Sequence, residues 1–257
     1  MKLINQSKSI VYVHSEKSKY FLQKIGVLEN LIKVVNHPCE AIMNIKEKDI
    51  QKCSTKFDYE LNAIIIGMFG FVGRYKGHDI ALNVLASLPK NYKLLIVGGQ
   101  HPEDRSEYFN YLLEQIEELG VVDRVQITGW VSQEEAEAFL GRTKICIAPY
   151  REVGLSGSGA LTWLLKSNRW IVVSKIDAFL PLLRTMPGIA STAEGSTNAL
   201  KWAIETLAAK EFESSPVKKQ IEDYVNSNSW NNHAKSLRCT YLNLLGVYDV
   251  SHLQPKQ

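Results

Sequence analysis

The chain has 257 residues, of which 45% are hydrophobic, and its 30 basic and 27 acidic residues give a formal net charge of +3. This length and composition predict a globular protein of one large or two small domains, and they exclude a largely disordered chain. The two kinds of charge are well mixed, which gives no general electrostatic basis for binding nucleic acid, so any anion site must be local.

The N-terminal part predicts a small strand, helix and strand at about 10–13, 15–25 and 32–35. One such unit cannot bury both faces of its own sheet, so a neighbouring structure must cover it. The polar stretch 45–60 that follows is predicted to be a linker.

Nothing in the sequence indicates export or membrane insertion. The first residues lack the apolar core of a secretory signal, and no segment approaches the roughly 18 apolar residues of a spanning helix. The four cysteines, Cys39, Cys53, Cys146 and Cys239, are scattered without C-x-x-C spacing, which fits a reducing compartment. We therefore expect a cytoplasmic protein with at most peripheral membrane contact.

From residue 62 onward, short apolar runs alternate with amphipathic stretches, which is typical of a parallel sheet covered by helices. Strands are expected at 63–68, 93–97, 125–128, 145–148 and 171–174, and helices at about 78–88, 104–119, 132–141 and 158–167. The runs are short and rich in β-branched residues, as strands buried on both faces are. The sequence therefore predicts an α/β fold with a doubly wound parallel sheet.

Two further helices are expected nearer the C-terminus. One begins after Glu194 and carries Leu200, Ile204 and Leu207, and the other spans about 229–245. Apolar residues recur along one face of the second helix, so something must cover that face. Together with the uncovered N-terminal unit, this predicts association with a partner or a second copy.

The glycine-rich turn 67–77 joins the first strand of the large sheet to a helix and carries Arg74 and Lys76. Glycines allow the backbone to approach an anion closely, and the helix start and the two cations favour a phosphate. An ordinary strand-to-helix turn is the alternative. A dehydrogenase fits poorly, because the turn is not G-x-G-x-x-G and the next strand ends in Gly98-Gly99-Gln100 without a carboxylate.

Several short motifs occur in one order along residues 10–241. They are Val11-Tyr-Val-His14-Ser15, Asn36-His37-Pro38, Phe69 to Gly77, Leu95-Ile-Val-Gly98-Gly99, Leu119 to Val125, Thr128-Gly129-Trp130-Val131, Ala148-Pro149-Tyr150-Arg151, Ser156-Gly157-Ser158-Gly159 and Ser229-Trp230. In this order the chain resembles the C-terminal, donor-binding half of nucleotide-sugar glycosyltransferases of the GT-B type, in the group of mostly retaining enzymes. The resemblance implies a Rossmann-like donor domain at 61–226, part of the acceptor-side domain and a linker at 1–60, and a C-terminal helix and tail at 227–257.

The resemblance also implies site residues. Arg74 and Lys76 correspond to the cations that neutralise the donor diphosphate in this family, and the main chain near Val131 corresponds to a nucleobase contact. The other donor-binding positions are Gly70, Gly73, Gly98, Glu152, Ser156, Gly157, Ser158 and Gly159.

The chain departs from the family pattern in two places. Many relatives carry two glutamates eight positions apart near the transferred sugar and the ribose, and here those positions fall on Leu155 and Trp163, with Glu152 the nearest carboxylate. Trp163 itself is predicted to be a core or interface residue, with a sugar platform as the alternative. The family's acceptor domain also contributes well over a hundred residues before the motif at Ile10, where this chain has nine.

These departures leave three hypotheses. The first is a hexosyl-type glycosyltransferase that transfers sugar from a UDP- or GDP-sugar. In it, a partner supplies the acceptor site, or a smaller cleft with residues 1–38 as one wall does so. The second is an inactive nucleotide-binding or interaction module, and the third is another sugar-nucleotide enzyme such as an epimerase. We expect no cofactor beyond the donor substrate and no metal, because the histidines lack ligand spacing. His14, His37 and His78 are predicted to be structural, with His78 at a solvated helix start.

Overall fold

The computed structural model of the chain describes residues 1–44, 57, 62–103 and 107–246. Within them the strands are β1 (Val11–Val13), β2 (Ile32–Val34), β3 (Ile64–Phe69), β4 (Tyr92–Val97), β5 (Val125–Ile127), β6 (Ile145–Ala148), β7 (Trp170–Ser174) and β8 (Ala190–Thr192). The α-helices are α1 (Lys2–Ser7), α2 (Glu16–Lys24), α4 (His78–Ser87), α5 (Tyr108–Glu118), α6 (Gln133–Gly141), α7 (Gly159–Lys166), α8 (Leu180–Thr185), α9 (Thr197–Ala208), α10 (Pro216–Ser227) and α11 (Trp230–Leu244). Short 3-10 turns are η1 (Glu29–Leu31), η2 (Arg74–Lys76), η3 (Val122–Arg124) and η4 (Asp177–Phe179).

The larger sheet has six parallel strands in the order β5-β4-β3-β6-β7-β8. The chain therefore builds the sheet outward from β3 in one direction and outward from β6 in the other. Strands β4, β6 and β7 are buried along their whole length, as expected where both faces are covered. This topology confirms the doubly wound α/β fold predicted from the alternating pattern.

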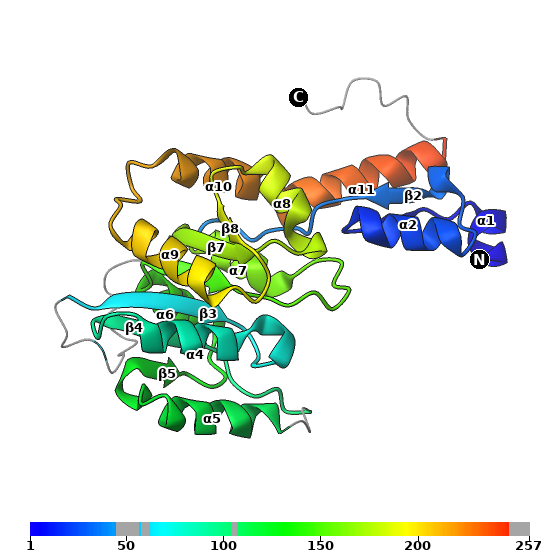
Figure 1. Cartoon of the computed structure of the whole chain (residues 1–257). Helices are drawn as coiled ribbons and strands as arrows, with labels where there is room; N and C mark the ends of the chain where they lie inside the picture. Colours follow the sequence, from blue (N-terminus) through cyan, green and yellow to red (C-terminus); the bar gives the residue numbers. More distant parts are fainter. Residues whose placement is uncertain (45–56, 58–61, 104–106, 247–257) are drawn as a thin grey trace.

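Helices cover both faces of this sheet (Figure 1). On one face α5, α4 and α9 contact one another in a row, and on the other α6 and α7 pack against β4 and β3, with α10 against α7. The strands and helices expected between residues 62 and 174 are present with nearly the expected bounds. Only the first residues of the helix expected at 104 cannot be compared, since 104–106 lie outside the described residues.

The two-stranded parallel sheet of β1 and β2 packs against α2 and confirms the strand, helix and strand expected near the N-terminus. It has a small core of its own, made by Val27, Leu31 and Ile32. Helix α11 lies beside this unit (Figure 1), and Lys33 Nζ in β2 donates to Thr240 Oγ1 in α11 over 3.1 Å. The C-terminal helix thus supplies part of the cover that the N-terminal unit needs.

Three elements beyond residue 175 add to those expected from the sequence: α8, β8 and α10. Strand β8 has three residues, too few for a clear alternation of buried and exposed side chains. Helix α10, in contrast, has readable signals, because Ser215 caps it, Pro216 opens it, and Val217, Ile221 and Tyr224 are buried at helical spacing.

Two other expectations concern the linker after the N-terminal unit and the prediction that no segment spans a membrane. The linker predicted at 45–60 lies outside the described residues except for Phe57, whose side chain is buried in the larger core. In the described part of the chain, no helix has both the length and the apolar character needed to cross a bilayer.

Candidate functional site

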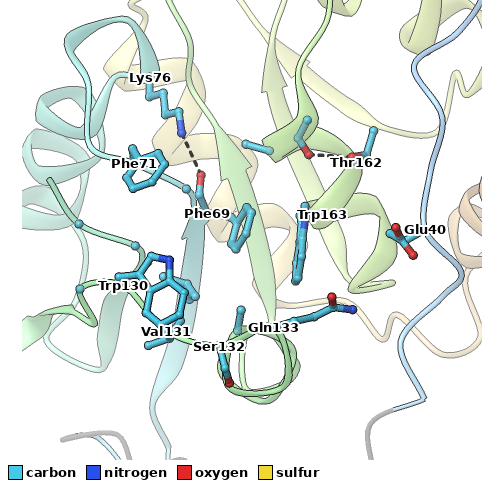
Figure 2. Close-up of a pocket in the computed structure, with 18 of the residues that line it drawn as sticks. Glu40, Phe69, Phe71, Lys76, Trp130, Val131, Ser132, Gln133, Thr162 and Trp163 are labelled. Atoms are coloured by element: carbon cyan, nitrogen blue, oxygen red, sulfur yellow. Dashed lines mark hydrogen bonds between the residues drawn. The ribbon is translucent and has the colours of Figure 1, made fainter. Parts of the chain in front are cut away.

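A cavity of about 540 Å³ lies at the carboxyl ends of β3, β4 and β5, beside the first turn of α7 (Figure 2). Its volume falls in the range of roughly 300–1,000 Å³ that is typical of small-molecule sites. The order of the strands reverses between β3 and β6, which is where doubly wound sheets bind ligands. The cavity is therefore the first candidate for a functional site.

Gly70 comes directly after β3 and lies where the end of this strand, the side chain of Lys76 and the start of α7 meet in the cavity wall. Its φ of +93° is in a backbone region that favours glycine. A Cβ atom on Gly70 would lie 2.5 Å from Lys76 Nζ and 3.5 Å from the Cβ of Ala160 in α7. The missing side chain thus leaves room for a lysine ammonium and a helix start to approach the same point.

Lys76 places a buried cation in the wall of this cavity. The residue is 5% exposed, and its Nζ lies 3.4 Å from the carbonyl oxygen of Phe69 (Figure 2). Burial lowers the pKa of Lys76 from its usual 10.5 to about 8. Desolvation opposes the charged form of a lysine, so an anion entering the cavity would stabilise that form.

The first turn of α7 forms the wall facing Lys76. Ser158 is the N-cap, and its hydroxyl accepts a hydrogen bond from the Leu161 amide over 3.2 Å. Gly159 and Ala160, the next two residues, line the cavity. The first N–H groups of a helix have no carbonyl partners within it and carry the positive end of its dipole, so this wall also favours an anion.

Arg74, which the sequence placed beside Lys76 as a second cation, is not among the residues that line this cavity. Its guanidinium lies over the rings of Tyr108 and Tyr111, at 5.0 and 5.7 Å from their centroids. Since Arg74 and Lys76 are two residues apart in a tight turn, they point in different directions. The structure brings only the lysine of this pair to the cavity wall.

A half-buried ion pair holds the turn that carries Lys76. Arg151, after β6, donates to both carboxylate oxygens of Asp79 over 2.9 and 2.7 Å, and also to the carbonyl of Arg74 over 2.7 Å. Tyr108 donates to the same carboxylate over 2.8 Å. Burial opposes ionisation of Asp79, but the hydrogen bonds from Arg151 and Tyr108 outweigh it and lower the pKa of Asp79. This network joins η2 and the start of α4 to the end of β6.

The remaining predicted site residues divide into three groups. Gly98, Val131 and Gly159 line the main cavity with Gly70, while Gly157 and Ser158 line a separate cavity of about 30 Å³ that also includes His14 and His37. Gly73, Glu152 and Ser156 line neither of these two cavities.

Glu152 instead orders its own loop. Its carboxylate accepts hydrogen bonds from the amides of Gly154 and Asp177, both over 2.9 Å, and lies 3.6 Å from Lys17 Nζ. These contacts join the loop after β6 to η4 and α2, away from the cavity. The structure therefore gives Glu152 a positional role and does not bring it to the candidate site.

His78 is not at a solvated helix start, and that expectation is wrong. Its side chain is fully buried, with Nδ1 3.4 Å from the carbonyl oxygen of Gly73, and burial together with the nearby Lys76 lowers the pKa of His78 to about 3. Among the described residues, no group of three or more His, Cys, Asp or Glu side chains comes together as a set of metal ligands.

An aromatic wall is the main feature that sequence reasoning missed. Trp163 was expected in the core or at an interface. It packs, partly buried, against the core, and it also lines the cavity, where it stacks on Phe69 with ring centroids 4.5 Å apart and planes 17° apart (Figure 2). Trp130, 82% exposed, and Glu40 also line it. Trp163 lies three residues after Ala160, on the face of α7 that meets β3. This spacing indicates a side chain that faces the cavity only once β3 is known to be the neighbouring strand.

Comparison with known proteins gives a family and a set of related folds. Residues 63–210 match the family model described as glycosyl transferases group 1. No curated protein matches the sequence.

Among solved structures, the chain is similar to HepE of Anabaena in complex with UDP and glucose, with a TM-score of 0.75 and 19% identity over 93% of this chain and 65% of that one. It is also similar to a glycosyltransferase from Rickettsia africae, with a TM-score of 0.78 and 18% identity over 95% of this chain and 66% of that one. For sucrose-phosphate synthase from Thermosynechococcus elongatus the TM-score is 0.75, at 16% identity over 93% and 59% of the two chains. The chain thus spans about two thirds of these structures or less, and at such identities the likeness concerns the fold.

Proposed function

This chain belongs to the group 1 glycosyl transferases, as its resemblance to the GT-B type predicted, and from that membership we propose that it binds a nucleoside-diphosphate sugar and transfers the sugar to an acceptor. The donor would bind in the cavity at the ends of β3, β4 and β5.

One observation carries this proposal: Lys76 Nζ and the first turn of α7 converge on Gly70. A diphosphate placed there would meet a full positive charge and a helix N-terminus at once. In sugar transfer from such a donor, negative charge grows on the departing diphosphate, and preorganised cations and N–H groups stabilise that charge. The same contacts would therefore bind the donor and assist its cleavage.

The rest of the cavity suits the remainder of a nucleotide. Val131 follows β5 and lines the cavity, and the family resemblance implies a main-chain contact with the nucleobase near it. The stacked Phe69 and Trp163 rings add an apolar wall to the cavity. HepE, similar in fold, has been crystallised with UDP and with UDP-glucose, which supports UDP as the first ligand to test.

A panel of UDP, GDP, ADP and their sugars, measured by thermal shift and calorimetry, tests donor binding. The correct ligand at 100 times its Kd should stabilise the protein by about 2.7 kcal/mol. Uridine without phosphates should stabilise it far less, since it lacks the charge that Lys76 and α7 would meet. If no nucleotide in the panel raises the melting temperature, the proposed donor site is wrong.

A partner or a second copy would supply the acceptor surface. Large apolar side chains on α2 and α11 are exposed, among them Tyr20, Phe21, Tyr241 and Leu244. Exposed apolar groups of this kind favour association. We expect light scattering at high protein concentration to report a dimer, and Phe21→Glu to shift it toward the monomer. A clean monomer for the unchanged protein would count against a second copy as the cover.

Nucleotide binding without transfer is the second candidate. It is favoured by Glu152, whose carboxylate is engaged by Gly154, Asp177 and Lys17 and does not line the cavity. Slow or absent release of UDP from a bound UDP-sugar, under conditions where binding is saturated, would favour this candidate over transfer.

A further inference from the structure

Lys166 is a buried cation close to the wall of the main cavity. It is the last residue of α7, and it is not among the described residues that line the cavity. Its Nζ lies 2.6 Å from a carboxylate oxygen of Glu137 in α6 and 4.6 Å from the centroid of the Trp163 ring. A charge that does not itself reach the cavity is therefore in contact with one of the aromatic side chains that line it.

Glu137 connects this cation to a second wall of the cavity. The same carboxylate oxygen, Oε1, accepts a hydrogen bond from the side-chain amide of Gln133 over 3.1 Å. Gln133 lines the cavity at the start of α6, and Trp163 lines it from α7 and stacks on Phe69 at the end of β3 (Figure 2). The contacts thus run from one lining residue to another and join α6, α7 and β3 around the cavity.

Stability alone gives little reason for a charged pair at this place. Burying two charges costs solvation that their attraction repays only in part, and neutral side chains of similar shape often serve as well. The side chains of Lys166 and Glu137 are 6% and 26% exposed, so water and salt screen the pair weakly. An apolar chain could fill the same space, whereas an ammonium is attracted both to the carboxylate and to the face of an indole ring. The pair therefore restricts where the Trp163 ring can lie.

Trp163 needs such a restriction, because it is only partly buried and borders open space on the cavity side. A side chain that is free to move loses that freedom when a ligand packs on it, and the loss weakens binding. Building on the function proposed above, we propose that Lys166 and Glu137 are positioning residues that hold Trp163 against Phe69 in the free protein. The cavity then has its binding shape before the nucleotide sugar enters, and the pair acts through Trp163 and not by contact with the ligand.

A double variant, Lys166→Met with Glu137→Gln, tests this assignment, because removing both charges leaves neither one buried without its partner. We expect its melting temperature to stay within about 3 °C of that of the unchanged protein. Its affinity for the tightest binder among UDP, GDP and ADP, measured by calorimetry, should fall about fivefold, since the loosened ring has to be ordered on binding.

Fluorine NMR of protein that carries 5-fluorotryptophan shows whether the ring itself has moved. The chain has five tryptophans, and a Trp163→Phe variant assigns the signal of Trp163. In the double variant we expect this signal to shift or broaden. The signal of Trp202, which is exposed on α9, should stay unchanged and serves as the internal reference.

Lys218→Met with Glu213→Gln is the matched control, since this ion pair lies at the surface and does not line the cavity. It should change neither the affinity nor the Trp163 signal. In the Lys166 and Glu137 double variant, an unchanged Trp163 signal, an unchanged affinity, or a large fall in melting temperature with all five signals displaced would each overturn the assignment. Failure of all three nucleotides to bind the unchanged protein would instead overturn the proposed function, and this role with it.

Discussion

Replacing Lys76 with methionine is expected to weaken binding of a nucleoside diphosphate about 100-fold, or about 2.7 kcal/mol. Methionine keeps the apolar stem that fills the wall and removes the ammonium that faces Gly70. The buried ammonium is costly in the free protein, as its lowered pKa indicates. The variant should therefore fold at least as stably as the unchanged protein, and calorimetry at pH 7 measures the affinity loss directly.

Arg74→Met is the matched control, because it removes the same charge two residues away. Arg74 lies over Tyr108 and Tyr111 and does not line the cavity. Its loss should change the affinity less than about threefold at physiological salt, where exposed charges are screened. Equal losses in the two variants would mean that general positive charge, and not the placement of Lys76, attracts the ligand.

The same lysine sets an expected pH dependence. A bound diphosphate raises the pKa of Lys76 above the value of about 8 in the free protein, so binding takes up a proton at higher pH. Affinity should be constant just below pH 8 and fall by up to about tenfold per pH unit above it. The Lys76→Met variant should lack this fall. A fall of equal size in both would assign the titration to another group.

Without ligand, Lys76 affects stability in the opposite direction. Its pKa is about 8 when folded and 10.5 in the reference state, so between these values the unfolded chain binds more protons. Stability from this group therefore rises as the pH increases from about 8 to 10.5. An increase in pH above about 8 should thus weaken ligand binding and, through the same lysine, stabilise the folded protein.

Gly98→Ala is expected to lower the free energy of unfolding by about 3 kcal/mol, and the melting temperature by about 9 °C. Gly98 has a φ of +142°, and a Cβ there would lie 2.3 Å from the carbonyl oxygen of Gly70. Its amide donates to Thr128 Oγ1, and its carbonyl accepts from Gly129, so the backbone is held from the β5 side as well. The clash is with the main chain of Gly70 and cannot be relieved by a rotamer change.

Gly120→Ala separates the clash from backbone strain. Gly120 also has a positive φ, +63°, but nothing lies within 4 Å of a Cβ at that position. This variant should lose only about 1 kcal/mol. Chemical denaturation of both variants gives the comparison, and equal losses would show that the contact with Gly70 is not what requires glycine at Gly98.

Local pattern in the sequence determined most of the architecture. The apolar runs from β3 to β7 are short, β-branched and separated by helical stretches, and this alternation admits few arrangements other than a parallel sheet covered on both faces. The glycine turn after β3 and the helix start at Ser158 follow from the same local rules. The family was also readable, because its motifs depend on order along the chain, and the family model confirms it.

What the tertiary structure alone decided is which side chains face the cavity. Arg74 and Lys76 carry the same charge in one turn, yet only Lys76 lies in the wall, because Tyr108 and Tyr111 of α5 offer Arg74 another surface. For a similar reason Glu152 does not line the cavity, since hydrogen bonds from the amides of Gly154 and Asp177 hold its carboxylate elsewhere. Directions of side chains depend on partners far away in the sequence, and no local spacing encodes those partners.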